Sequence, residues 1–200
     1  MRTSTDTQVA SKIKGTMVSQ IYQWLSDTYG QELLNEALLL IPLEERELFQ
    51  KKILSLGSYP LSSWAKYLDV CYVKVKSKTG ESEATFYKNL IHGGGSKMLK
   101  AVYTFLMVFI SPTGIIKRLP LIYGRTYDSG GAEVLLNEPG ETKVRYYGPK
   151  DMHRHMQQFG LPTLCYLLEL SGAKSISGKI ANEHADLVEF SFEAVVTYQA

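Results

Sequence analysis

Apolar residues recur at the spacing of an α-helix through the first two thirds of the chain. Between residues 9 and 28 they fall at every fourth position, at Ile13, Met17, Ile21 and Leu25. Residues four apart lie on one face of a helix, so this segment is predicted to be a helix with one buried face. Gly30 is expected to end this helix.

Six more segments in this part of the chain carry helical patterns of different strength. The strongest is PLSSWAKYLDVCYVKVK, in which apolar residues form one stripe, and the most apolar is MLKAVYTFLMVFI. A kink is expected at Pro120, inside the last segment. The predicted helices lie around residues 33–38, 42–48, 60–76, 81–91, 98–110 and 112–128.

The pattern changes to period two after Asp128. Residues 132–136 and 142–147 alternate apolar and polar side chains, and NEPGE between them is typical of a turn, so a β-hairpin is predicted. The segments AKSISGKI and LVEFSFEAVV alternate in the same way and predict a second pair of strands. One face of the last strand would carry Val188, Phe190, Phe192, Ala194 and Val196.

A helix is predicted between the two pairs of strands. Helical spacing returns in DMHRHMQQFGLPTLCYLLELSG, where Asp151 is a candidate N-cap and Gly172 a candidate C-terminal stop. A break is expected near Gly160 and Pro162.

The order of these segments predicts an α+β protein. Its helical N-terminal two thirds would pack on a C-terminal antiparallel sheet of strand-strand-helix-strand-strand order. The chain has 200 residues, 44% of them hydrophobic, and no internal repeat or long linker. We therefore expect a flexible polar tail at 1–8 and a single domain over 9–200, with a mainly helical part at 9–128 and a sheet part with one long helix at 129–200.

Charge and cysteine usage exclude several classes of function. The net charge is only +2, so no strong field is available to hold nucleic acid. Cys71 and Cys165 lie far apart in apolar segments, which predicts free thiols and a cytoplasmic location. The longest apolar run, at 98–110, contains Lys100 and is shorter than the roughly 20 residues that span a bilayer, so no membrane span is expected.

Three consecutive glycines stand in IHGGGSK, residues 91–97. A phosphate-binding loop follows a strand and ends in Lys-Ser, whereas here a helical pattern precedes the glycines and the order is Ser-Lys. We interpret the segment as a helix break in which one glycine takes a left-handed conformation after His92, and Ser96 caps the next helix. An anion site at that helix terminus is the alternative.

No group of residues marks a metal or catalytic site. His153 and His155 are two apart on a predicted helix and would point to nearly opposite sides, so we expect surface histidines rather than metal ligands. His92 and His184 stand alone. Neither a Gly-x-Ser-x-Gly motif nor a Cys-His pair is visible. We expect no metal, no cofactor and no enzymatic activity.

The segment LPLIYGRTYDSGG joins the helical part to the sheet and contains Tyr123, Arg125, Tyr127 and Asp128. Such a polar group indicates either a binding site or a structural lock between helix and sheet. We favour the lock, in which Arg125 pairs with a carboxylate while Tyr127 covers the core.

Five segments resemble a myxobacterial paralogous family of uncharacterised proteins. They are KGTMVSQIYQWLSDTYG, LIPLEEREL, YPLSSWAKYLD, YDSGGAEVLLNEPG and FGLPTLCYLLELSGAKSISG. The resemblance extends over about residues 14–196 and implies a shared fold, without indicating an activity.

The layout of helices and two hairpins also resembles the superfamily of haem-based nitric oxide and oxygen sensors, vinyl-reductase-type ligand-binding domains and vesicle-tethering TRAPP subunits. That resemblance implies a regulatory or scaffolding domain, often dimeric, which holds a ligand or acyl chain between helices and sheet. The haem sensors carry a Tyr-x-Ser-x-Arg motif and an axial histidine on a central helix. Here the junction reads Tyr123-Gly-Arg125-Thr-Tyr127, and residues 98–110 contain no histidine, so haem is not expected.

We therefore expect a non-enzymatic sensory or regulatory domain that binds a small apolar ligand or a protein partner, and that self-associates. The alternative is a cavity-free, homodimeric interaction scaffold, and the third hypothesis is an unrecognised enzyme using His92, Lys97 or Tyr123. Cys71 matches the acylated cysteine of some tethering subunits, although a plain core thiol is preferred. The candidate pocket residues are Trp64, Leu68, Cys71, Phe105, Phe109, Tyr123, Phe190 and Phe192, with Arg125, Tyr127 and Asp128 as a polar junction.

Overall fold

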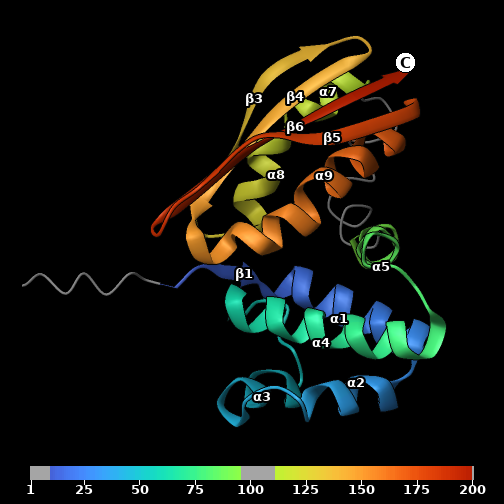
Figure 1. Cartoon of the computed structure of the whole chain (residues 1–200), viewed down its shortest axis with the longest axis vertical. Helices are drawn as coiled ribbons and strands as arrows, with labels where there is room; N and C mark the ends of the chain where they lie inside the picture. Colours follow the sequence, from blue (N-terminus) through green and yellow to red (C-terminus); the bar gives the residue numbers. More distant parts are fainter. Residues whose placement is uncertain (1–9, 96–110, 200) are drawn as a thin grey trace, which may run out of the picture.

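The computed structural model of the protein describes residues 10–95 and 111–199, which form two halves that pack on each other (Figure 1). The first range forms a helical half and the second forms a sheet half. The predicted tail at 1–8 and the predicted helix at 98–110 lie outside the described residues.

The helical half contains most of the helices predicted from the periodicity. In Figure 1, α1 and α4 run beside each other, and α2 and α3 lie on the far side from the sheet. The rings of Tyr22 on α1 and Tyr67 on α4 stack with their centroids 6.2 Å apart. The elements are β1 (Lys12–Lys14), α1 (Gly15–Tyr29), α2 (Gln31–Leu38), α3 (Leu43–Gln50), β2 (Ser58–Pro60), α4 (Leu61–Thr79), α5 (Glu83–Leu90) and the π-helix η1 (Ile91–Gly95).

The first predicted helix begins later than its apolar pattern indicates. Ile13 belongs to β1, which pairs with β2 opposite Tyr59, and the helix starts only at Gly15. At that point the Gly15 amide donates to the Gly57 carbonyl at 2.8 Å. Gly30, with φ of 87°, ends the helix as expected.

The sheet half confirms the predicted strand-strand-helix-strand-strand order and with it the α+β fold class. Its four strands form one antiparallel sheet of order β3-β4-β6-β5, and α9 runs across one face of that sheet (Figure 1). The elements are α7 (Pro112–Ile116), α8 (Leu119–Thr126), β3 (Gly131–Glu138), β4 (Glu141–Pro149), the 3-10 helix η2 (Lys150–Met152), α9 (His153–Leu170), β5 (Lys174–Ala185) and β6 (Glu189–Gln199).

The two faces of the sheet differ in chemistry because side chains alternate along each strand. The inner face is apolar, and there Tyr146 of β4 stands opposite Phe192 of β6. The outer face carries a charged ladder, in which Arg145 lies 3.2 Å from both Glu133 and Glu193. Val188 does not belong to the apolar face as predicted, because it precedes β6 and is 61% exposed.

Two predicted helix irregularities, a kink at Pro120 and a break near Gly160, do not occur in the described helices. Pro120 sits in the first turn of α8, where proline is tolerated, so the chain turns before it rather than kinking at it. The helix α9 continues through Gly160 and Pro162 without the expected break. Asp151 does not cap α9 but accepts hydrogen bonds from the amide and hydroxyl of Ser11, at 3.0 and 2.8 Å.

Polar contacts join the two halves at the start of the described chain and beside α9. Asp151 holds Ser11, and Asp128 accepts a hydrogen bond from the Lys12 amide at 2.7 Å. Further along, the Arg154 guanidinium donates to both carboxylate oxygens of Asp69 at 3.0 Å. The segment at residues 11–12 is therefore fixed to the sheet half although it belongs to the helical half.

The glycines of IHGGG do not break the helix as predicted. Residues 91–95 continue α5 as η1, and none of the three glycines has a positive φ. Two of them must be small because η1 crosses α1: a Cβ on Gly93 would lie 1.8 Å from the Trp24 indole nitrogen, and one on Gly94 would lie 2.9 Å from the Ile21 Cα. The motif is a close helix crossing, and Ser96 and Lys97 lie outside the described residues.

We expect Gly94→Ala to lower the free energy of unfolding by about 2 kcal/mol, because the new methyl group would overlap backbone that has no room to move. Gly95→Ala is the matched control, since among the described residues its Cβ would meet only the Ile91 side chain, at 3.9 Å, and it should change stability by less than about 1 kcal/mol. Urea denaturation measures both variants. Equal losses in the two would contradict the crossing as the reason for the glycine.

Candidate functional site

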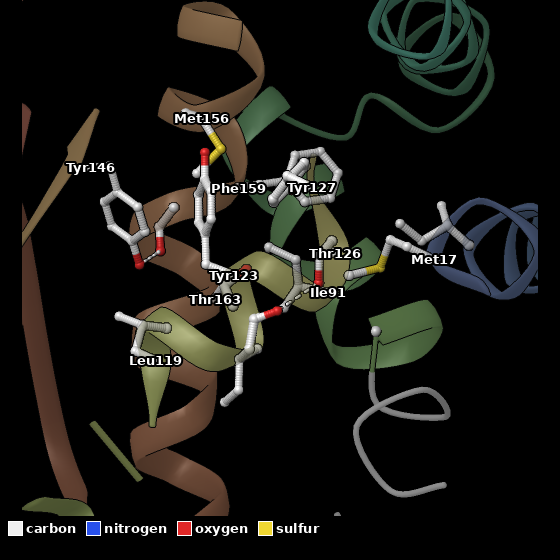
Figure 2. A pocket seen from close by; sticks show the side chains of 14 residues that line it. Met17, Ile91, Leu119, Tyr123, Thr126, Tyr127, Tyr146, Met156, Phe159 and Thr163 are labelled. Atoms are coloured by element: carbon white, nitrogen blue, oxygen red, sulfur yellow. Dashed lines mark hydrogen bonds between the residues drawn. The ribbon is translucent and has the colours of Figure 1, made fainter. Parts of the chain in front are cut away.

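An apolar cavity of about 50 Å³ lies between the two halves. The helical half contributes α1 and η1 to its wall, and the sheet half contributes α8, β4 and α9 (Figure 2). The lining residues are Met17, Ile21, Ile91, Gly95, Leu119, Ile122, Tyr123, Thr126, Tyr127, Tyr146, Met156, Phe159, Gly160 and Thr163.

Two helices of the sheet half present the same pattern to the cavity. The lining positions are spaced i, i+3, i+4 and i+7 on each helix, which places them on one helix face. They are Leu119, Ile122, Tyr123 and Thr126 on α8, and Met156, Phe159, Gly160 and Thr163 on α9.

Most hydroxyl groups around the cavity already have partners inside the protein. Tyr146 donates to the Gly160 carbonyl at 3.1 Å, and Thr126 donates to the Ile122 carbonyl at 3.1 Å (Figure 2). Tyr123 has a long contact of 3.9 Å with the Met152 sulfur. Burial raises the pKa of Tyr123 and Tyr146 above the usual tyrosine value, so these hydroxyls stay neutral.

A buried tyrosine-histidine pair lies next to the cavity. The Tyr127 hydroxyl is 2.9 Å from Nε2 of His155, whose ring stacks on Phe159 at 4.3 Å. Burial lowers the pKa of His155 to about 3, so its imidazole is neutral at physiological pH. His155 was expected at the surface, but it is buried because it faces Tyr127, a partner 28 residues away.

The cavity does not lie where the candidate pocket residues were expected to meet. Of them, Tyr123 lines it, and so does Tyr127 of the polar junction. Trp64, Leu68 and Cys71 are buried on α4 and are not among the residues that line it. Phe105 and Phe109 lie outside the described residues.

The other predicted pocket residues belong to the packed core. Phe190 and Phe192 lie on the inner face of the sheet, where Phe192 packs on Tyr146 at 5.4 Å. Cys71 is fully buried, and burial raises the pKa of its thiol to about 12. A thiol that remains protonated is a poor nucleophile, which favours the core role over acylation.

The predicted lock at the polar junction forms without Arg125. This side chain is exposed, and no carboxylate pairs with it in the part of the chain that the structure describes. Asp128 makes the link instead, through the Lys12 amide, and Ser129 donates to the same carboxylate at 2.7 Å. Matching residues of opposite charge along the sequence does not reveal a carboxylate, such as that of Asp128, whose partner is a backbone amide.

Residues 10–95 and 111–199 contain neither a candidate metal site nor a candidate membrane span. This part of the chain has no group of three His, Cys, Asp or Glu residues arranged to hold a metal ion. No helix within it has the length and hydropathy needed to cross a membrane. His92 approaches Glu169 at 3.6 Å and is not among the residues that line the cavity.

Several solved structures of H-NOX proteins have this fold. One is the unliganded Fe(II) H-NOX protein from K. algicida, which is 16% identical, with a TM-score of 0.65 over 94% of this chain and 97% of that chain. Another is an oxygen-binding H-NOX domain related to soluble guanylate cyclases, which is 12% identical, with a TM-score of 0.65 over 94% of this chain and 95% of that chain. The chain therefore has the fold of the H-NOX domains, and the distant resemblance to haem-based sensors is confirmed for the fold.

No family model matches the sequence, and no curated protein matches it. The resemblance to a myxobacterial family therefore remains a prediction.

The described residues do not fit haem, the group that some of the similar H-NOX structures were used to study. The cavity is about 50 Å³, whereas pockets for ligands of drug size have volumes of roughly 300–1,000 Å³. Neither histidine nor cysteine is among the lining residues. His155 is bonded to Tyr127 and stacked on Phe159, so its ring is committed to the core.

Proposed function

We propose that the chain is a non-enzymatic sensory or regulatory domain that holds a small apolar ligand, without haem, between its helical and sheet halves. The observation that carries the proposal is the apolar cavity whose wall is shared by the two halves. A guest in this cavity would contact Met17 and Ile91 of the helical half and Phe159 of the sheet half at once. Its binding would favour the arrangement of the halves that encloses it.

The H-NOX fold supports a sensory role, because one of the similar structures is described as an oxygen-binding domain. The size of the cavity limits the guest to a few atoms, since about 50 Å³ has room for only a few water-sized molecules. The absence of enzymatic activity is part of the proposal. It agrees with the lining hydroxyls of Tyr146 and Thr126, which already donate to backbone carbonyls. The free thiols Cys71 and Cys165 support a cytoplasmic location.

Xenon tests the cavity directly, because it is a small apolar probe that enters dry cavities. We expect xenon to shift NMR signals of methyl groups at Met17, Ile91 and Met156. The variant Thr163→Leu places a larger side chain in the cavity wall. It should weaken xenon binding about fivefold, which corresponds to roughly 1 kcal/mol. Thr16→Leu, at an exposed position on α1, is the matched control and should bind xenon like the parent protein.

Absence of xenon binding to the parent protein would reject the cavity as a ligand site. Equal weakening in both variants would show that the effect does not come from the cavity. Native mass spectrometry of the protein as purified, with an absorbance spectrum, then shows whether a guest is retained. A Soret band would overturn the proposal that the domain works without haem.

A protein-interaction scaffold is the second candidate. Three leucines at the connection between α2 and α3 are more than half exposed, namely Leu39, Leu40 and Leu43. Exposed apolar groups of this kind are found at docking surfaces. Light scattering over a range of concentrations distinguishes this candidate, because a strict monomer would count against self-association.

A further inference from the structure

The pair formed by Tyr127 and His155 has one hydrogen-bond donor too many for its surroundings. The neutral imidazole carries one N–H and the tyrosine carries one O–H, which makes two hydrogens. The contact of 2.9 Å between the Tyr127 hydroxyl and Nε2 of His155 uses one of them. The other hydrogen must lie on Nδ1 of His155 or on the Tyr127 oxygen.

Neither position of the second hydrogen has an acceptor in the described chain. Nδ1 of His155 is buried and has no hydrogen-bond partner there, and His155 is not among the residues that line the cavity. The hydroxyl of Tyr127 makes no other hydrogen bond within the described chain, and Tyr127 does line the cavity. A buried donor without an acceptor costs roughly 1–3 kcal/mol, so a guest that supplies an acceptor would gain affinity.

We propose that the ligand of the cavity is a small uncharged molecule with a hydrogen-bond acceptor, such as a short ketone, and that Tyr127 donates to this acceptor while His155 orients the hydroxyl. The inference rests on the proposed function, because it names the chemistry of the same site. The carbon skeleton of the guest would contact the apolar wall. Its oxygen would be held by the hydroxyl of Tyr127.

The tautomer of His155 differs between the free protein and the complex with a guest. Without a guest, the arrangement with Nδ1–H and with Tyr127 donating to Nε2 leaves one unmet donor. It is favoured over the other tautomer, which leaves both an unmet O–H and an unmet acceptor. With an acceptor in the cavity, Nε2–H donates to the Tyr127 oxygen and Tyr127 donates to the guest. The unmet donor on Nδ1 is thereby exchanged for an unmet acceptor, which is the less unfavourable group to bury. One proton leaves Nδ1 for water and one is taken up at Nε2, so the imidazole remains neutral.

Acetone and isobutene are matched probes, because they differ in the replacement of a carbonyl oxygen by a CH₂ group. Nitrogen-15 NMR of the histidine side chains in the parent protein should show the Nδ1–H tautomer of His155 without a guest and with isobutene. Acetone should convert it to the Nε2–H tautomer. Retention of Nδ1–H at saturating acetone would overturn the inference and would leave the proposed function intact.

Affinity gives a second, independent readout. Tyr127→Phe should weaken acetone binding about fivefold, the loss of roughly 1 kcal/mol that one neutral hydrogen bond contributes, and should change isobutene binding less than about twofold. Tyr147→Phe removes a hydroxyl from a half-exposed side chain on the outer face of the sheet and should leave both affinities unchanged.

Isobutene reports whether the Tyr127→Phe variant is folded and retains its cavity. An equal loss for both probes would assign Tyr127 a packing role and would overturn the inference. Failure of the parent protein to bind either probe would instead reject the proposed function itself.

Discussion

Replacing Trp64 with alanine is expected to lower the free energy of unfolding by about 4 kcal/mol, the usual cost of truncating a fully buried tryptophan. Trp64 is 0% exposed, and its ring packs on Phe49 and Tyr67 at 5.7 and 5.8 Å. The loss should come from the cavity left between α3 and α4, since the Trp64 indole nitrogen has no hydrogen-bond partner in the described chain. Urea denaturation followed by circular dichroism measures the change.

Trp24→Ala is the control for this experiment, because Trp24 is only half-buried and should cost less stability. Trp64→Phe keeps most of the packing and allows ligand binding to be tested at the same position. We expect xenon affinity in this variant to equal that of the parent protein, since Trp64 is not among the cavity-lining residues. A reduced affinity would restore Trp64 to the ligand site that the sequence predicted.

Gly130→Ala is expected to lower the free energy of unfolding by about 3 kcal/mol. Gly130 has a φ of 70°, a backbone conformation that residues with a Cβ rarely adopt. In addition, the new methyl carbon would lie 2.5 Å from the Tyr147 carbonyl oxygen and 3.1 Å from the Gly148 Cα. Both neighbours are backbone atoms of β4, so relief would require the strand to shift. Thermal and urea unfolding would report the loss.

Gly80→Ala separates the two causes of that loss. Gly80 is left-handed, with a φ of 74°, and none of the described residues has an atom within 4 Å of its hypothetical Cβ, so this variant should lose only about 1 kcal/mol from the strained backbone. The difference between the variants measures the close approach of Gly130 to β4. If the two variants lose the same stability, the contact with Tyr147 has no energetic role.

The fold class could be predicted because period and length identify elements in this chain with little ambiguity. The alternating pattern of the last strand placed Phe190, Phe192, Ala194 and Val196 on one face, and the structure buries all four. Helical spacing similarly identified α4. The prediction was wrong where tertiary contacts decide local structure, as at Ile13, which pairs as a strand with a segment more than 40 residues away.

The glycine triplet was misread for a related reason. A glycine is required either by its own backbone angle or by what crosses it, and sequence reveals only that a glycine is present. Gly94 needs no unusual angle but lies against Ile21 of another helix. The crossing partner cannot be inferred from the local motif.

The candidate site was only partly predictable. Tyr123 was predicted as a pocket residue and Tyr127 as part of the polar junction, and both line the cavity. The i, i+3, i+4, i+7 pattern from Met156 to Thr163 was visible in the sequence, but it is the same pattern that core helices show. Whether a buried helix face packs tightly or borders a cavity depends on how side chains from α1, η1, α8, β4 and α9 fit together.

The charged ladder on the outer face of the sheet limits how two copies of the chain could meet. Stacking on that face would remove water from the exposed side chains of Arg145 and Glu133, which already pair with each other within one sheet. The dehydration of such groups opposes burial unless new partners replace the water. A symmetric assembly that leaves these residues hydrated would use another surface, such as the one that carries the exposed Leu39, Leu40 and Leu43 of the helical half.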